Sequence, residues 1–526
     1  MQAERVQLTA RETAGSFVRT SLNLRGTQDE NGSVFHWVII ALIGFYFVAG
    51  SWLFGGVVLW TRLILFWMAV VIFLLAVAPV KDRRTRDGAL NRSRKAFVTL
   101  LRFPVFWIGL LLFGYVGLQW SNPAWTYTEI GGRWWISNVG LKPNLDWPTS
   151  VYAPIERGNP GSFLLRFVGV WLVICAGWIV IRRRKELLTV LIIFAVNSFL
   201  VALVAVIQAI DLPSKVLWVY PWPRPDFAGP FFYRNHGGAF FYLAAAISFG
   251  LALYFQRKWE PSQTRSSPTI VFAVFGLMNS GAVAASGSRA GWVFGTAILL
   301  CYAVLSTGIW LRRSQWRTSS FSGIIVGLLV SILIVSIVAA QNQETLERHF
   351  RRLLNVPAEL EYSGRTIGND ASIVMFQDVP IFGYGADSYG HVFSLYIDQF
   401  PELVRQNRRT GGIRTSWVQA HNDPLQMAVE LGIVGASIIS LFLLYYLVMF
   451  LAKISWFREE TILWSVAVLV LFLHSFADLI FQSTILLALF ALLPATVLLS
   501  LRFEKQEQVS LQGPKSSTGK LTPRTP

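Results

Sequence analysis

Residues 421–450 read HNDPLQMAVELGIVGASIISLFLLYYLVMF, a polar hexapeptide followed by an apolar run in which Glu430 is the one charged residue. An apolar run of this length can cross a bilayer as a helix. Asp423 is predicted to cap the helix N-terminus, and Pro424 suits the first helical position. We therefore expect a membrane-spanning helix with His421 directly outside its N-terminus.

The rest of the chain repeats this apolar pattern. Of its 526 residues, 54% are hydrophobic and 14% are charged, and the mean hydropathy is +0.49. A soluble domain carries about 25% charged residues, so a single soluble globule is excluded. We expect an all-α polytopic integral membrane protein with about twelve transmembrane helices. The predicted spans are residues 34–52, 58–80, 97–118, 162–181, 187–208, 237–255, 268–286, 291–310, 321–340, 424–451, 461–480 and 483–501.

The net charge of +17 would indicate nucleic-acid binding in a soluble protein, so the position of the 46 Lys and Arg residues matters. Every second connection between the predicted spans is basic, and these connections and the two tails hold 28 of the 46. The positive-inside rule places them in the cytoplasm. The charge thus indicates topology, with both termini cytoplasmic, and we expect no nucleic-acid partner.

This topology divides the chain into five parts. They are a cytoplasmic tail at 1–33, nine helices within 34–340, a large external loop at 341–423, three helices within 424–501 and a disordered cytoplasmic tail at 502–526. A second external segment, at about 119–161, is rich in aromatic residues: Trp120, Trp125, Tyr127, Trp134, Trp135, Trp147 and Tyr152. We favour an aromatic belt at the membrane interface, and the alternative is a platform that stacks on sugar rings.

The large external loop carries Arg but no Lys. Its basic residues are Arg348, Arg351, Arg352, Arg365, Arg405, Arg408, Arg409 and Arg414. A guanidinium group holds phosphate oxygens through two parallel hydrogen bonds, so an all-Arg loop beside a membrane indicates a phosphate or pyrophosphate site. For most of these residues the alternative is an ion pair with an acidic residue of the same loop. Arg289, in the short turn 287–292, either snorkels or points into a cavity.

Other ionisable groups lie inside or beside the predicted spans. The positive end of the predicted helix favours a neutral His421 that can accept a proton, and the alternative is a polar interfacial His. The remaining groups are Arg234 and His236 before the sixth span, Glu430 in the tenth, and His474 and Asp478 in the eleventh. His474 and Asp478 stand four residues apart, so a mutual hydrogen bond that orders the bundle is the alternative to a chemical role.

Neither a metal nor a cofactor is expected. Cys175 and Cys301 lie in apolar runs without a neighbouring His or second Cys, which argues against a metal site and a disulfide framework. No two Asp residues are two positions apart, so the Asp-x-Asp signature of metal-dependent nucleotide-sugar transferases is missing.

Several short motifs occur along the chain in this order: Arg234-Asn235-His236, Gly287-Ser288-Arg289-Ala290-Gly291, Gly364-Arg365, Gly383-Tyr384-Gly385, and His421-Asn422-Asp423 with Glu430-Leu431-Gly432. The ordered set resembles the bacterial O-antigen ligase and O-antigen polymerase superfamily over about residues 230–480. The resemblance implies a membrane glycosyltransferase of the C type in the bacterial inner membrane, with a large periplasmic loop. It also implies transfer of an oligo- or polysaccharide from undecaprenyl pyrophosphate to a hydroxyl of lipid A-core or of a growing lipid-linked chain. Such transfer would be independent of metal and would invert the anomeric centre.

The resemblance also implies roles for individual residues. Arg289 and Arg365 would hold the pyrophosphate, and His421 would be the general base. Supporting roles are expected for Arg234, His236, Asn422, Asp423, Glu430, His474 and Asp478. The alternative function is a lipid-linked oligosaccharide flippase or other polysaccharide transporter, because such a protein would also have about twelve spans and buried polar residues.

Overall fold

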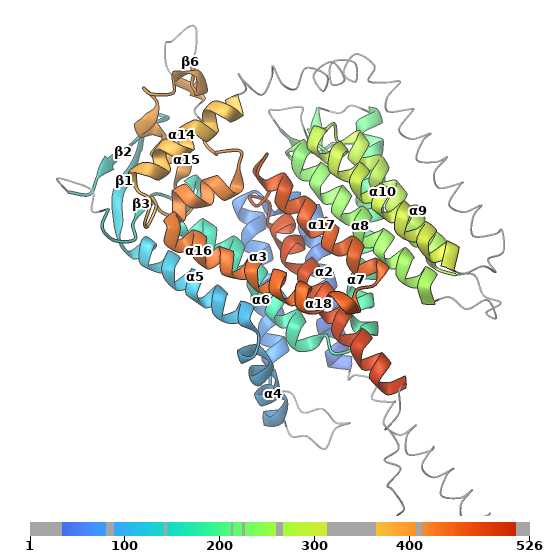
Figure 1. Cartoon of the computed structure of the whole chain (residues 1–526). Coiled ribbons are helices and arrows are strands. Elements are labelled where there is room, and N and C mark those ends of the chain that lie inside the picture. The colour runs from blue at the N-terminus through green and yellow to red at the C-terminus, as the bar shows by residue number, and fades with distance from the viewer. Residues whose placement is uncertain are drawn as a thin grey trace, which may run out of the picture.

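The structure is a computed structural model, and it describes residues 34–79, 89–140, 145–211, 214–222, 227–258, 267–312, 364–406, 413–415 and 417–511. Within these ranges nine helices are long and apolar enough to cross a membrane (Figure 1). They are α2 (Val34–Trp52), α3 (Leu59–Val77), α5 (Pro104–Ser121), α6 (Pro160–Val180), α7 (Arg184–Asp211), α8 (Arg234–Lys258), α10 (Arg289–Arg312), α16 (Asp423–Ala452) and α18 (Thr484–Leu511). Two shorter helices, α9 (Thr269–Ala285) and α17 (Glu459–Ser475), lie beside them. The expected all-α polytopic membrane protein is confirmed.

Eleven of the twelve predicted spans correspond to these helices, and the span at 321–340 lies outside the described residues. Three predicted boundaries are wrong. Helix α18 continues to Leu511, so residues 502–511 are helical and do not belong to a disordered tail. The span 97–118 combines the amphipathic helix α4 (Ala89–Leu101) with α5, which begins only at Pro104 because a residue before proline avoids the helical conformation. The span 461–480 runs past the end of α17 at Ser475, because the N–H groups of Ile480 and Phe481 bond to a side chain instead of continuing the helix.

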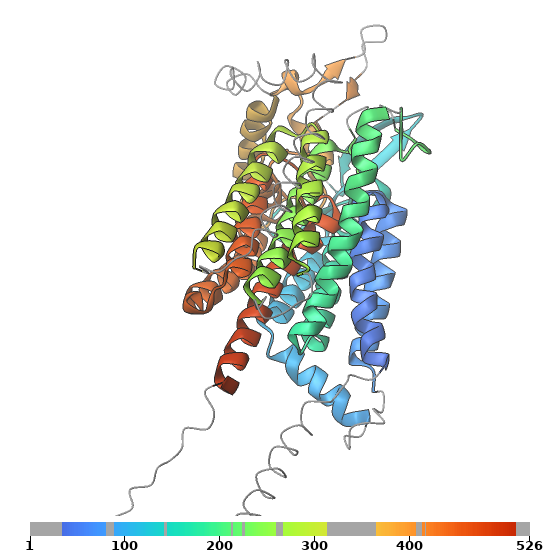
Figure 2. The same ribbon diagram turned by 90° about the vertical axis from the view of Figure 1, so that its right-hand side faces the viewer.

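The helix ends form two faces. The basic face carries Arg184, Arg257, Arg312 and Arg458, and the Glu504 carboxylate lies among them. Arg184 and Arg458 both contact Glu504, at 2.9 and 2.8 Å, which brings the ends of three helices together. Helix α2 begins on this face, where His36 contacts Glu186, and α18 ends there (Figure 2). The opposite end, which carries the strands within residues 123–152, the helix at 364–378 and the start of α16, is the loop face.

Helices α8 and α18 form the buried centre of the bundle, whereas α3, α10 and α16 present apolar side chains outward. Small residues allow the central helices to approach their neighbours closely. Gly250 of α8, for example, packs directly on the Trp464 indole of α17. This packing fixes α8, whose first turn lies on the loop face.

The loop face is covered by a small folded layer. Strands β1 (Pro123–Ile130) and β2 (Arg133–Asn138) form an antiparallel hairpin that turns at Gly131 and Gly132, both with positive φ, and β3 (Ser150–Tyr152) pairs parallel to β1. Trp125 and Met375 belong to a hydrophobic cluster that joins this sheet to α14 (Gly364–Asp378) and α15 (Tyr389–Val392). The segment at 119–161 and the segment before α16, called external after the predicted topology, therefore pack together.

Short elements complete the described chain. On the external segments these are η2 (Ile155–Arg157), η3 (Phe393–Tyr396), η4 (Pro401–Leu403), β6 (Arg405–Gln406) and β7 (Ile413–Thr415). The connections between helices contain η1 (Phe54–Gly56), β4 (Lys215–Val216), β5 (Tyr220–Pro221) and η5 (Ile454–Trp456).

Helix α16 is interrupted at Gly432, where φ is +62° and ψ is −172°. Residues 379–385 enter this break, and the Ile433 N–H donates to the Pro380 carbonyl oxygen (2.8 Å). The Tyr115 hydroxyl of α5 contacts the carbonyl oxygen of Phe382 in the inserted segment and that of Leu431 in α16. These bonds satisfy backbone groups that the break in α16 frees, and they anchor the large external segment.

Candidate active site

Asp478 is the centre of a polar cluster on the loop face. It lies in the connection between α17 and α18, and its side chain is 1% exposed. The groups that contact its carboxylate are His421 Nδ1 (3.1 Å), Arg365 Nη2 (2.9 Å), the Tyr233 hydroxyl (2.9 Å), the Asn235 amide and the Leu479 N–H (2.9 Å). One carboxylate therefore joins the large external segment, the start of α8 and the start of α16.

His421 is positioned by its backbone and by Asp478. Its φ of +56° lies in the left-handed region, which costs a non-glycine residue about 1–3 kcal/mol. Its ring centroid lies 5.0 Å from that of Trp417, and its side chain is 27% exposed. A carboxylate only accepts hydrogen bonds, so the contact with Asp478 assigns the hydrogen to Nδ1. Nε2 is then the ring nitrogen that can take a proton.

The residues after His421 begin α16 and hold the Asp478 loop. Asn422 is the N-cap, since its Oδ1 accepts from the Leu425 N–H (3.1 Å), and the predicted Asp423 cap is wrong. Asp423 is buried instead, and its Oδ2 accepts from the N–H groups of Ile480 (2.6 Å) and Phe481 (2.8 Å). The exchange is possible because Asn and Asp cap helices equally well.

The charge of Asp478 is favoured although the group is buried. Burial alone would raise the pKa of its carboxyl group, but the hydrogen bond from His421 and the charge of Arg365 outweigh burial and hold the pKa well below its usual range. Burial, followed by the charge of Asp478, raises the pKa of Tyr233, so this hydroxyl stays protonated and donates. The anion can orient the His421 ring and stabilise a positive charge on it.

Arg365 and Arg289 lie on the same face in different surroundings. Arg365 is in the first turn of α14, and its side chain is 43% exposed and paired with Asp478. Arg289 begins α10 and is exposed. Ser288, the residue before Arg289, packs closely on α8, because a Cβ on Gly238 would lie 2.8 Å from the Ser288 Cβ. Gly238 is one turn from Asn235, so Ser288 packs on the turn of α8 that follows Asn235. Arg348, Arg351, Arg352, Arg408 and Arg409 lie outside the described residues.

His474 and Asp478 do not form the predicted hydrogen bond. Helix α17 ends at Ser475, so a spacing of four residues no longer places both side chains on one helical face. His474 is fully buried, and its Nδ1 lies 3.1 Å from the Tyr242 hydroxyl.

Of the other residues with expected supporting roles, His236 and Arg234 lie beside the cluster, whereas Glu430 lies apart from it. Nε2 of His236 lies 2.6 Å from the Leu479 carbonyl oxygen, and Arg234 begins α8 on the same turn. Glu430 lies deeper in α16 and accepts from the Asp387 N–H (2.9 Å). Its described contacts hold the large external segment rather than the Asp478 carboxylate.

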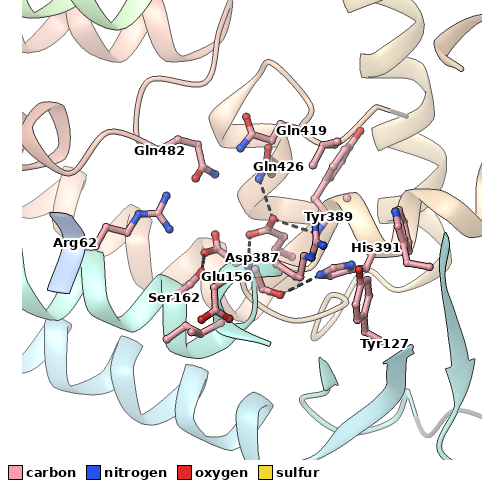
Figure 3. A pocket seen from close by; sticks show the side chains of 17 residues that line it. Arg62, Tyr127, Glu156, Ser162, Asp387, Tyr389, His391, Gln419, Gln426 and Gln482 are labelled. Atoms are coloured by element: carbon pink, nitrogen blue, oxygen red, sulfur yellow. Dashed lines mark hydrogen bonds between the residues drawn. The ribbon is translucent and has the colours of Figure 1, made fainter. Parts of the chain in front are cut away.

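A second polar group beside the cluster was not predicted. Arg166 of α6 is 2% exposed and contacts both Asp387 and Gln482, and the Ser162 hydroxyl also donates to Asp387. Ser162, Asp387 and Gln482, together with Arg62 of α3, line a cavity of about 370 Å³ (Figure 3). A signal for both arginines was present in the sequence, since each interrupts an apolar helix and charge at membrane depth marks function.

Comparison with protein families adds an independent observation. Residues 273–440 match the family model described as O-antigen ligase. This match supports the resemblance of this part of the chain to the O-antigen ligase and polymerase superfamily. The search of curated proteins found no match to the chain.

The O-antigen ligase match covers about a third of the chain, from α9 into α16, and includes Arg289, Arg365 and His421. Asn235 and Asp478 lie outside it. The cluster therefore forms where the ligase segment meets α8 and the connection between α17 and α18. The match to the O-antigen ligase model supports glycan transfer in general.

Proposed function

We propose that the protein transfers an oligo- or polysaccharide from undecaprenyl pyrophosphate to a hydroxyl of an acceptor glycan at the periplasmic face of the bacterial inner membrane. The acceptor is lipid A-core or a growing lipid-linked chain. The observation that carries the proposal is the contact between His421 and Asp478 beside Arg365. It combines a base, a group that orients the base, and a cation in one place.

In the proposed reaction His421 Nε2 takes the proton from the acceptor hydroxyl. The acceptor oxygen attacks the anomeric carbon, the bond from that carbon to the pyrophosphate oxygen breaks, and the configuration inverts. Asp478 orients the imidazole and stabilises the imidazolium that forms. Pyrophosphate is a good leaving group, so the reaction needs no metal if Arg365 and Arg289 hold its charge.

An apolar cavity supports a lipid-linked donor. It measures about 370 Å³ and lies between α5, α6, α16, α17 and α18. Its lining includes Pro424, Phe476 and Phe481, which are close in sequence to His421 and Asp478. A polyprenyl chain in this cavity would keep its pyrophosphate at the loop face.

The test is His421→Ala in the purified full-length protein, with product formation and donor binding measured side by side. Loss of a general base lowers rates by about 10²- to 10⁴-fold, so transfer should nearly stop. Binding of the lipid-linked donor should change little, because arginines rather than His421 hold the pyrophosphate.

The matched control is His474→Ala, which removes a buried imidazole that contacts Tyr242 and not Asp478. This variant should retain far more activity than His421→Ala. Full turnover by the His421→Ala protein would contradict the assignment of the base.

A further inference from the structure

The cavity lined by Arg62, Asp387 and Gln482 is bounded by two different kinds of surface (Figure 3). It lies between the β1–β2 hairpin, the start of α6 and residues 387–391, and its volume is about 370 Å³. One wall is aromatic and comes from Tyr127, Trp134 and His391. The other walls carry amides, carboxylates and guanidinium groups.

The aromatic wall is a fixed surface. The rings of Tyr127 and Trp134 stack with centroids 5.7 Å apart and planes inclined by 26°. The His391 ring meets both edge-on, with centroids 5.1 and 5.8 Å away. Its Nε2 lies 3.1 Å from the Gly158 carbonyl oxygen, and burial lowers the pKa of His391, so the ring is neutral at pH 7. A neutral aromatic surface of this kind suits the apolar C–H face of a pyranose ring.

The polar walls are held in place by hydrogen bonds. The Gln426 amide donates to Glu430 (2.9 Å), and Gln482 accepts from Arg166. Arg157 donates to both oxygens of Glu129, each at 2.8 Å. Planar amide, carboxylate and guanidinium groups offer paired donors or acceptors, which match neighbouring hydroxyls on a sugar ring.

Two residues that line the cavity are close in sequence to residues of the candidate active site. Gln419 stands two residues before His421, and Gln482 stands four residues after Asp478. The β1–β2 hairpin and α10, which begins with Arg289, lie on opposite sides of α16 and α17 (Figure 1). The cavity therefore lies at the hairpin side of α16, whereas α10 lies on the other side of α16 and α17.

We infer that this cavity is the acceptor subsite and that it binds a pyranose ring of the acceptor glycan against Trp134 and Tyr127. The inference rests on the proposed glycan transfer. It explains why the Trp-rich external segment folds into a hairpin that forms one wall of the cavity. It also assigns different roles to two neighbouring Trp residues of β2: Trp134 lines the cavity, whereas Trp135 is 44% exposed.

The first experiment measures sugar binding with the full-length protein in lipid nanodiscs, by saturation-transfer NMR titration. Two probes are used: core oligosaccharide released from the host lipopolysaccharide by mild acid, and the repeat-unit oligosaccharide of its O-polysaccharide. At least one should bind, and Trp134→Ala should weaken that binding roughly tenfold through loss of the stacking surface. Trp134→Phe should retain most of it, and Trp135→Ala should bind like the wild type.

The second experiment measures transfer. Trp134→Ala should raise KM for the acceptor and leave KM for the lipid-linked donor unchanged, while His421→Ala should still bind the oligosaccharide. If neither probe binds the wild type, or if Trp134→Ala and Trp135→Ala bind alike, the subsite is wrong even when His421→Ala is inactive. If Trp134→Ala loses binding while His421→Ala keeps full turnover, the sugar site stands and the proposed base is wrong.

Discussion

The carboxylate of Asp478 determines how His421 can react. It is buried, and it accepts from the imidazole on one side and from Arg365 on the other. The strained backbone at His421 fixes the position from which its side chain extends. The Asp478 carboxylate holds Nδ1, so Nε2 is the ring nitrogen that faces away from Asp478. Asp478 is therefore a positioning residue whose loss should be visible in the rate rather than in donor affinity.

Asp478→Asn keeps the size of the side chain and removes its charge. We expect kcat to fall about 10- to 100-fold with little change in KM for the donor, because the ring is held less well and the imidazolium is stabilised less. Steady-state transfer by the purified protein measures both constants. Asp211→Asn, at an exposed carboxylate that ends α7, is the control and should keep its activity. A wild-type kcat for Asp478→Asn would remove its positioning role.

The proposed pyrophosphate ligands Arg365 and Arg289 differ from lysine in the shape of the charged group rather than in its charge. Arg365→Lys and Arg289→Lys should each lose much of the transfer activity, since a single ammonium cannot replace two parallel hydrogen bonds to pyrophosphate. Product formed at matched protein levels in membranes is the measurement, with Arg133→Lys on the exposed side of β2 as the control. Wild-type product from both Lys variants would exclude a phosphate role for them.

At the scale of elements, the break in α16 links the large external segment to the membrane helices. Gly432 has a left-handed φ, and a Cβ there would overlap the Ile381 carbonyl oxygen. Gly383 faces the same contact, and its Cβ would meet the backbone of residues 430–432. Both glycines belong to motifs that carry the family resemblance, and the structure gives them a packing role.

Gly432→Ala should therefore destabilise the protein. The strained φ and the overlap with Ile381 together should cost at least about 2 kcal/mol. The melting temperature of the detergent-solubilised protein is the measurement. Gly114→Ala is the control, because its Cβ would meet no atom within 4 Å on a regular helix, α5. Equal melting temperatures for the two variants would mean that the break adapts freely.

The elements show where sequence reasoning succeeds and where it stops. Long apolar runs predict helices such as α7 and α18, because burying backbone groups in lipid requires helices. The end of α17 was misplaced, since it depends on Asp423, a residue far away in the sequence that binds the next backbone groups. The β1–β2 hairpin was not predicted either. Its aromatic residues are typical of a membrane interface, and their packing on α14 and α15 is a long-range contact.

At the scale of the whole molecule, the same distinction applies to the candidate site. His421, Arg365 and Asp478 were each selected from the sequence, yet their meeting at one carboxylate was not. The local spacing instead favoured a pair between His474 and Asp478, which the end of α17 prevents. Arg166 shows the opposite case, since a charged residue within an apolar helix was recognisable without any contact.

The two faces of the molecule lead to a prediction about orientation. Arg184 contacts Glu504 on the basic face, whereas Arg414 belongs to β7 in the large external segment on the loop face. The positive-inside rule predicts that the basic face is cytoplasmic, which would give the candidate site access to a donor and an acceptor in the periplasm.

Reporter fusions test this orientation directly. A phosphatase that is active only in the periplasm should be active when fused after Arg414 and inactive after Arg184. A fluorescent protein that matures only in the cytoplasm should give the opposite result at the same two positions, which controls for poor expression of either fusion. Arg184 and Arg414 lie on opposite faces of the bundle, so a bundle that spans the membrane must place them on opposite sides of it. Finding both on one side would overturn the topology, and finding them reversed would turn His421 toward the cytoplasm and exclude a periplasmic glycan transfer.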